Sequence, residues 1–181
     1  MPEATIIAQT TVWIKSVVIG CNFCPFAAKA MSTKSIRYKV LHDANTENTL
    51  ETLILEMAFL DGAEDIETTL IILPYRFEDF TQYLQLVRSA EKTVTRQGYD
   101  GVYQVASFHP EYCFAGTDND DPANYTNRSP YPMLHILREE SISQAIGQHF
   151  EAKGIPARNI AFAREKGLRY MQLLRAVCME E

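Results

Sequence analysis

The residues best suited to chemistry gather in one irregular stretch, from His109 to Glu139. It holds two of the four histidines, one of the four cysteines, three aspartates, two arginines and three tyrosines. An irregular stretch of this length inside a compact domain is usually either functional or disordered. The tyrosines favour a packed segment over a disordered one. We therefore predict a loop that forms a site.

Arg128 is the candidate for binding an anion in this stretch, because a guanidinium grips carboxylate or phosphate through two parallel hydrogen bonds. It lies in an unusually polar string, residues 124–132. Asn124, Tyr125 and Asn127 flank it and are candidate ligand-binding residues. In the alternative interpretation, the Asn and Thr side chains build turns and Arg128 pairs with a nearby aspartate.

Two histidines of the stretch could transfer protons, because imidazole titrates near neutrality. His109 is the leading catalytic candidate and His135 a candidate ligand-binding residue. A lone histidine in such a place can equally be structural. The sequence contains neither a Gly-x-Ser-x-Gly nucleophile signature nor a glycine-rich phosphate loop. The acidic run Asp118–Asp121 does not follow the calcium-loop pattern and is predicted to be a solvated turn.

A second group of reactive residues is the pair Cys21-x-x-Cys24. Pro25 suits the first position of a helix, which would place Cys24 at the N-cap, where free N–H groups stabilise a thiolate. Cys24 is therefore a candidate nucleophile. Alternatively, both cysteines are small buried residues. With Cys113 and His109 they could also form a zinc site of three sulfur ligands and one nitrogen ligand.

The hydrophobic pattern predicts the elements that position these residues. Strands are expected at residues 36–41, 68–73 and 102–108, and residues 133–137 form a fourth strand or begin a helix. Helices are expected at residues 5–18, 45–60, 77–97, 141–150 and 159–177. The expected fold is α/β (or α+β): a small, three- to four-stranded, mainly parallel sheet with helices packed on it, in a single layered domain over residues 1–181.

This topology brings several polar residues to one edge. The three strands would point their carboxyl ends the same way, and ligands of open α/β sheets bind at that edge. The residues that leave the strand ends are His42-Asp43, Tyr75-Arg76 and His109-Pro110. Arg76 therefore joins Arg128 as a candidate ligand-binding residue, and Arg138 is a third.

Composition limits the partners. The chain has 181 residues, a net charge of −6 and a pI near 5.3. An acidic chain lacks the basic face that nucleic acids need. No apolar run reaches the roughly 20 residues that span a bilayer, and the N-terminus does not resemble a secretory signal. We expect a cytoplasmic protein that binds a small anionic molecule. The sequence identifies neither a cofactor nor an oligomeric state.

Two stretches resemble a bacterial family of about this length, known only as a domain of unknown function, number fourteen-fifteen. They are Gly20-Cys21-Asn22-Phe23-Cys24-Pro25-Phe26-Ala27 and the segment from His109-Pro110 through Asn-Tyr-Thr-Asn-Arg-Ser-Pro-Tyr-Pro to Glu139. The resemblance implies a stand-alone domain with no assigned activity. The family usually has Leu where this chain has Cys21, which counts against the paired-cysteine hypotheses and leaves Cys24.

Three hypotheses follow. The first is a small-molecule enzyme or ligand-binding domain with an anion-accepting polar pocket, roofed by residues 109–139. The second is a metal-binding or thiol-redox protein that uses Cys24 with Cys21, Cys113 and His109. The third is a non-enzymatic domain that binds a partner protein through the same loop.

Overall fold

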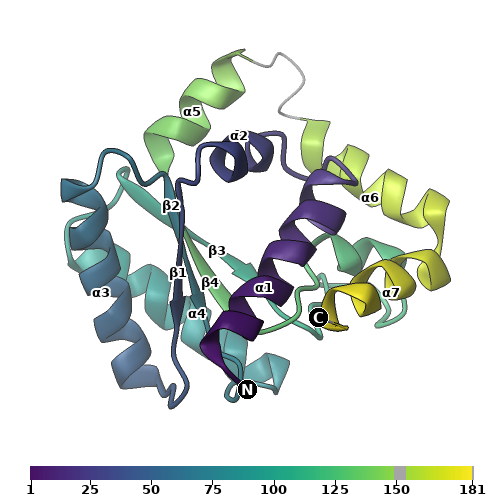
Figure 1. The fold of residues 1–181 in the computed structure, drawn as a ribbon, viewed down its shortest axis with the longest axis horizontal. Coiled ribbons are helices and arrows are strands. Elements are labelled where there is room, and N and C mark those ends of the chain that lie inside the picture. The colour runs from purple at the N-terminus through teal and green to yellow at the C-terminus, as the bar shows by residue number, and fades with distance from the viewer. Residues whose placement is uncertain (149–153, 181) are drawn as a thin grey trace.

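The computed structural model describes residues 1–148 and 154–180. At its centre lies a four-stranded sheet with helices on both faces (Figure 1). The strands lie in the order β1 (Ile36–Val40), β2 (Thr68–Ile72), β4 (Met133–Arg138) and β3 (Tyr103–Phe108). The expected α/β architecture is confirmed, and residues 133–138 form a strand.

The sheet is mixed rather than mainly parallel. β1 pairs with β2 in parallel, whereas β4 is antiparallel to both β2 and β3. The physical reason is the long β3–β4 loop (residues 109–132), which turns the chain back so that β4 inserts between β2 and β3. β1, β2 and β3 still run in the same direction, so their carboxyl ends share one edge.

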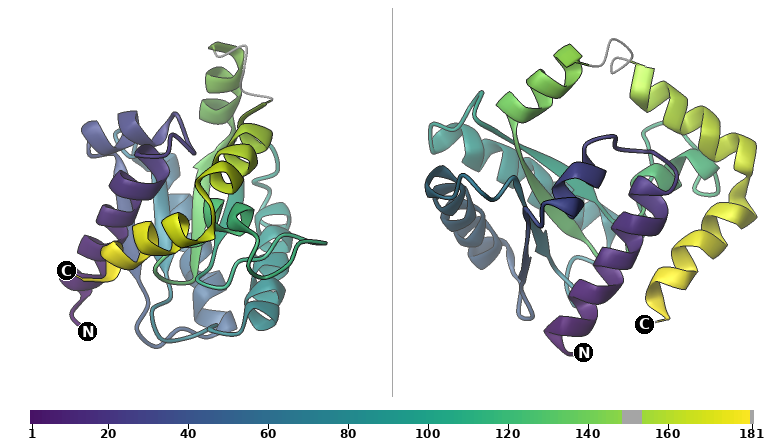
Figure 2. Two further views of the ribbon diagram at one scale, coloured as in Figure 1. Left: turned by 90° about the vertical axis from the view of Figure 1, so that its right-hand side faces the viewer. Right: turned by 45° about the horizontal axis from the view of Figure 1, so that its top comes forward.

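One face of the sheet is covered by α3 (Thr46–Gly62) and α4 (Phe80–Arg96), whose buried side chains join Ile71 and Leu134 in one apolar core. The other face is covered by α1 (Glu3–Trp13) and by the C-terminal helices α6 (Ile155–Lys166) and α7 (Leu168–Ala176). Figure 2 shows α1 and α4 on opposite sides of the strands. All five residues of β2 are buried. Because successive side chains of a strand point to opposite faces, β2 is covered on both sides.

Shorter elements complete the described chain. They are the π-helix η1 (Ile14–Ile19), α2 (Ala27–Ser32), the 3-10 helix η2 (Pro122–Thr126), α5 (Glu139–Gln148) and η4 (Val177–Met179). The last two residues of the helix expected at 141–150 lie outside the described residues. The helix expected at 159–177 is two helices, because Gly167 between them takes φ +81°. Among the described helices, none is long and apolar enough to cross a membrane.

Candidate functional site

The carboxyl edge of β1 and β2 carries an open groove of about 380 Å³. We call it the rim groove; its lining residues are Asp43, Ala44, Asn45, Thr46, Arg76, Phe77 and Gln82. They come from the segments that leave the two strands and from the first turns of α3 and α4. The structure thus brings the predicted Asp43 and Arg76 together. His42 lies beside them on the rim, with its ring centroid 5.8 Å from that of Tyr75.

Both helices that border the rim groove begin with a side-chain cap. Asn45 and Asn48 form a reciprocal capping box at the start of α3, with N–O distances of 2.8 and 3.0 Å. Asp79 accepts a hydrogen bond of 2.8 Å from the backbone N–H of Gln82 at the start of α4. These caps fix the two first turns, so the groove walls are rigid segments placed by the sheet edge.

The charged side chains of the rim groove are left open. Arg76 and Asp43 are exposed, and neither side chain makes a hydrogen bond or an ion pair within the described part of the chain. A cation and an anion therefore face the same groove without neutralising each other. Such a pair can receive a ligand that carries complementary groups.

His109 does not line the rim groove; it contacts the groove wall through the backbone carbonyl group of Phe77. Its side chain is fully buried, and Nε2 donates to the carbonyl oxygen of Phe77 at 2.8 Å. Nδ1 accepts from the backbone N–H of Glu111 at 2.9 Å. This assigns a neutral imidazole with its proton on Nε2, and neither nitrogen is free to face a ligand.

The surroundings of His109 keep the ring uncharged. Its centroid lies 4.8 Å from that of Tyr83 and 5.1 Å from that of Phe80. Burial lowers the pKa of His109, which the bond to Phe77 opposes only in part. Phe77 has a left-handed φ of +60°, which costs backbone energy in a residue other than glycine. His109 thus holds a strained turn in the groove wall.

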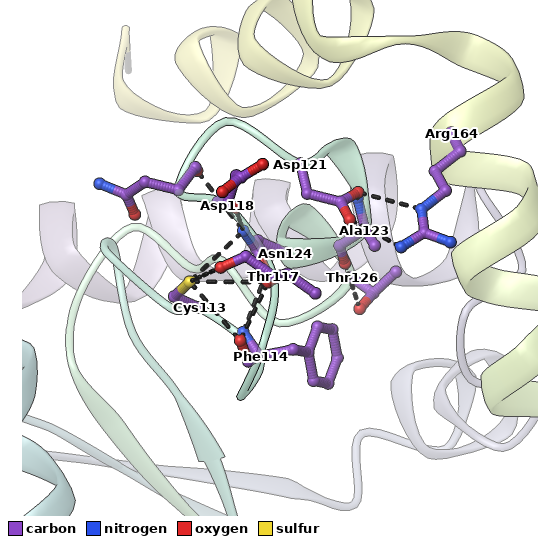
Figure 3. Close-up of polar contacts among 10 residues, drawn as sticks. Cys113, Phe114, Thr117, Asp118, Asp121, Ala123, Asn124, Thr126 and Arg164 are labelled. Carbon is purple, nitrogen blue, oxygen red and sulfur yellow. Dashed lines mark hydrogen bonds and ion pairs between the residues drawn. The ribbon is translucent and has the colours of Figure 1, made fainter.

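Asn124 lies at the centre of the β3–β4 loop and bonds only within it (Figure 3). Its Oδ1 accepts from the Phe114 N–H and the Thr117 hydroxyl, each at 3.0 Å. Its Nδ2 donates to the carbonyl oxygens of Asp118 at 2.9 Å and Asn119 at 3.4 Å. The side chain is fully buried, so Asn124 fastens the loop instead of facing the groove.

Asp118, Asn119 and Asp120 are exposed, as expected for a solvated turn, whereas Asp121 bonds within the protein. Asp121 caps η2 through the N–H of Ala123 at 2.9 Å and receives two hydrogen bonds from Arg164 of α6, at 3.1 and 2.7 Å. Hydrogen bonding from Arg164, then from the Ala123 N–H, lowers the pKa of Asp121. The aspartate that pairs with an arginine thus pairs with Arg164 and not with Arg128.

The other residues of the polar string pack rather than line the rim groove. Arg128 is 7% exposed and Tyr125 is 5% exposed, with the guanidinium carbon 4.7 Å from the ring centroid. Asn127 accepts from the Thr126 hydroxyl at 3.1 Å, and its carbonyl oxygen accepts from the His109 N–H at 3.3 Å. The string therefore ties the loop to the end of β3, away from Arg76.

Arg138 and His135 lie elsewhere. Arg138 is at the opposite end of the sheet, where its Nη2 donates to the last carbonyl groups around the end of α3, those of Leu60, Ala63 and Ile66. Cations favour that position because of the helix dipole. His135 is in the middle of β4 and shares a hydrogen bond of 2.6 Å with the Thr68 hydroxyl. The structure thus separates both residues from the rim groove.

Comparison with known proteins places the chain in a family. A family model described as "Protein of unknown function (DUF1415)" matches residues 5–173. The chain belongs to the DUF1415 family. No curated protein and no solved structure matches it. The family description assigns no activity, so the function is argued from the site.

The cysteines of this DUF1415 chain do not assemble as expected. Helix α2 begins at Ala27 with Phe26 as its N-cap, so Cys24 lies before the cap and not at it. Burial raises the pKa of Cys21. All four cysteines are free, and the described residues contain no group of three or more His, Cys, Asp or Glu that could hold a metal ion. Cys21, Cys24, Cys113 and His109 thus do not form one ligand set.

The sequence interpretation missed three residues that complete the wall of the rim groove, Asn45, Thr46 and Gln82. A signal was present for Asn45: it follows a strand end and precedes an apolar helical repeat, as an N-cap does. Gln82 gave no such signal, because only the packing of α4 against the sheet places it. Arg175 is a further residue that the sequence interpretation missed: it is partly buried and donates from Nε to the Ser129 carbonyl oxygen at 3.1 Å.

Proposed function

We propose that the protein is a ligand-binding domain that accepts a small anionic molecule in the rim groove. The observation that carries the proposal is the open Arg76 guanidinium in a groove of about 380 Å³ between the first turns of two helices. Arg76 would bind a carboxylate or phosphate through two parallel hydrogen bonds. The N-terminal ends of α3 and α4 add a favourable potential for negative charge.

Asp43 restricts which anions fit. Its open carboxylate lines the same groove, so it repels a ligand with two negative ends and attracts a ligand with an amine. Asn45, Thr46 and Gln82 supply hydrogen-bonding groups between the two charges. A zwitterion such as a free amino acid matches this arrangement better than a plain carboxylic acid.

We propose ligand binding and name no reaction, because both ring nitrogens of His109 bond to the backbone. This geometry supports a role for His109 in holding the Phe77 turn and, with it, the groove wall. Cys24 lies on the other side of the fold, in a loop that α6 holds through the hydrogen bond from Asn159 Nδ2 to the Phe23 carbonyl oxygen, at 2.7 Å.

The proposed setting is the bacterial cytoplasm. The family resemblance supports a bacterial source. The four free cysteines, of which Cys21 and Cys178 are buried, fit a reducing compartment.

The first prediction concerns Arg76→Gln. A thermal-shift screen of amino acids and matched simple carboxylic acids should find ligands, and isothermal titration should then show binding weakened by at least about 10-fold in this variant. Loss of a charge-assisted hydrogen bond gives an effect of that size. Arg88→Gln, an exposed arginine in the middle of α4, is the matched control and should bind like the unmodified protein.

Asp43→Asn separates the two ligand classes. It should weaken the binding of amino acids, and it should leave the binding of simple carboxylic acids unchanged or strengthen it. A panel in which nothing stabilises the protein would contradict the proposal. So would an equal response in the unmodified protein and in Arg76→Gln.

A further inference from the structure

Two arginines bond to backbone carbonyl groups of the β3–β4 loop, where α7 packs against η2 of that loop. Arg128 donates from Nε to the Tyr112 carbonyl oxygen at 3.0 Å and from Nη2 to the Asn119 carbonyl oxygen at 2.8 Å. Arg175 donates from Nε to the carbonyl oxygen of Ser129, the next residue along. Both guanidinium groups are thus fixed by neutral acceptors of the same loop.

The charge of this pair is not neutralised by the described residues. No carboxylate among them lies within 4 Å of either guanidinium; the two ion pairs found there are Arg37–Glu56 and Arg164–Asp121. Burial lowers the pKa of Arg175, and the nearby charge of Arg128 lowers it further. Two partly desolvated like charges are costly unless a counter-charge accompanies them.

Hydrogen-bond donors remain open around the pair. Nη1 of Arg128 and both terminal nitrogens of Arg175 have no acceptor among the described residues. The Tyr125 hydroxyl has no hydrogen-bond partner there either, although the side chain is 95% buried and its ring lies under Arg128. The hydroxyl oxygen itself is reached by solvent, so a ligand can supply its partner. These donors are open to an acceptor that a ligand brings.

We propose that Arg128, Arg175 and Tyr125 form a phosphate-binding site that is separate from the rim groove. A phosphate group carries a charge of about −1.5 to −2 at neutral pH and has three acceptor oxygens. It can therefore satisfy two guanidinium groups and a hydroxyl together, whereas a single carboxylate has one charge and two oxygens. The Trp13 indole N–H, which donates to the Arg128 carbonyl oxygen at 3.0 Å, fixes the backbone beneath the site.

The Glu111 carboxylate lies near the proposed site. It is near enough to raise the pKa of Arg175, against the larger effect of burial, but not within ion-pairing distance. It therefore opposes a bound anion without replacing it. This gives the site a variant that should gain affinity, namely Glu111→Gln.

The test is isothermal titration at constant ionic strength with inorganic phosphate, phenyl phosphate and benzoate. Both phosphates should bind with saturation, and benzoate at least about 10-fold more weakly. Arg175→Gln should weaken phosphate binding at least about 10-fold, and Tyr125→Phe severalfold. Glu111→Gln should strengthen it. Arg169→Gln, an exposed arginine on the same helix, is the matched control and should change nothing.

The outcomes separate this site from the rim groove. Phosphate binding that survives Arg175→Gln but is lost in Arg76→Gln overturns the proposal, as does equal binding of phosphate and benzoate. Should Arg175→Gln fail to fold, Arg175→Lys retains the charge without the planar fork, and unchanged phosphate affinity in it would contradict the site. Tighter binding of phenyl phosphate than of phosphate identifies phosphorylated small molecules as the ligands; the reverse identifies the free ion.

Discussion

The rim groove and the β3–β4 loop differ in what their polar side chains do. The loop has the denser set of hydrogen-bonding residues, yet Asn124, Asp121 and Asn127 bond to their own chain. The rim groove has fewer polar residues, but Arg76 and Asp43 are open. A high density of polar residues therefore indicates a ligand site only where their hydrogen bonds are not already made within the protein.

His109 joins these two regions. It bonds to Phe77 in the groove wall and to Asn127 and Glu111 in the loop. The loop is thus a brace for the sheet edge, and the groove is the surface that the brace leaves free. Substitutions of loop residues that bond within the loop, such as Asn124, should then cost stability, and substitutions in the groove should cost binding there.

The largest effect is expected for Asn124→Ala. This change removes every hydrogen bond of a fully buried amide and leaves the Phe114 N–H without its acceptor, whereas the Thr117 hydroxyl keeps the Phe114 carbonyl oxygen at 2.9 Å. We expect the free energy of unfolding to fall by about 3 kcal/mol. Urea unfolding measures it, with Gln85→Ala on the exposed side of α4 as a control that should change stability by less than about 0.5 kcal/mol. A loss below about 1 kcal/mol would show that the loop does not act as a brace.

Acid should lower the stability of the folded protein. Burial lowers the pKa of His135 from 6.5 to about 4 and also lowers that of His109. The unfolded chain then takes up protons at a higher pH than the folded chain. Stability is therefore complete above about pH 6.5 and is lost as the pH falls toward 4, by up to about 3 kcal/mol from His135 alone.

Urea unfolding at several pH values between 7.5 and 4.5 measures this loss. His135→Gln should flatten the pH profile, whereas His42→Gln, at an exposed rim position, should leave it unchanged. An equally steep profile in His135→Gln would assign the acid sensitivity to other groups.

The sequence predicted the place of the groove better than its contents. The meeting of Asp43 and Arg76 followed from the strand–helix–strand order, because right-handed crossovers give β1 and β2 a common direction. The insertion of β4 could not be predicted, since periodicity does not reveal strand order. The role of His109 depends on the left-handed turn at Phe77, which no local pattern specifies.

The smallest change in the free energy of unfolding is expected for Arg76→Gln. This variant gives the sharpest test of the difference between the rim groove and the β3–β4 loop. Arg76 is exposed and makes no hydrogen bond or ion pair within the described chain, so folding gains little from its charge. The free energy of unfolding without ligand should change by less than about 0.5 kcal/mol, as in Arg88→Gln. A loss near that of Asn124→Ala would mean that Arg76 supports the fold. With unchanged stability, any loss of ligand binding in Arg76→Gln belongs to the groove itself.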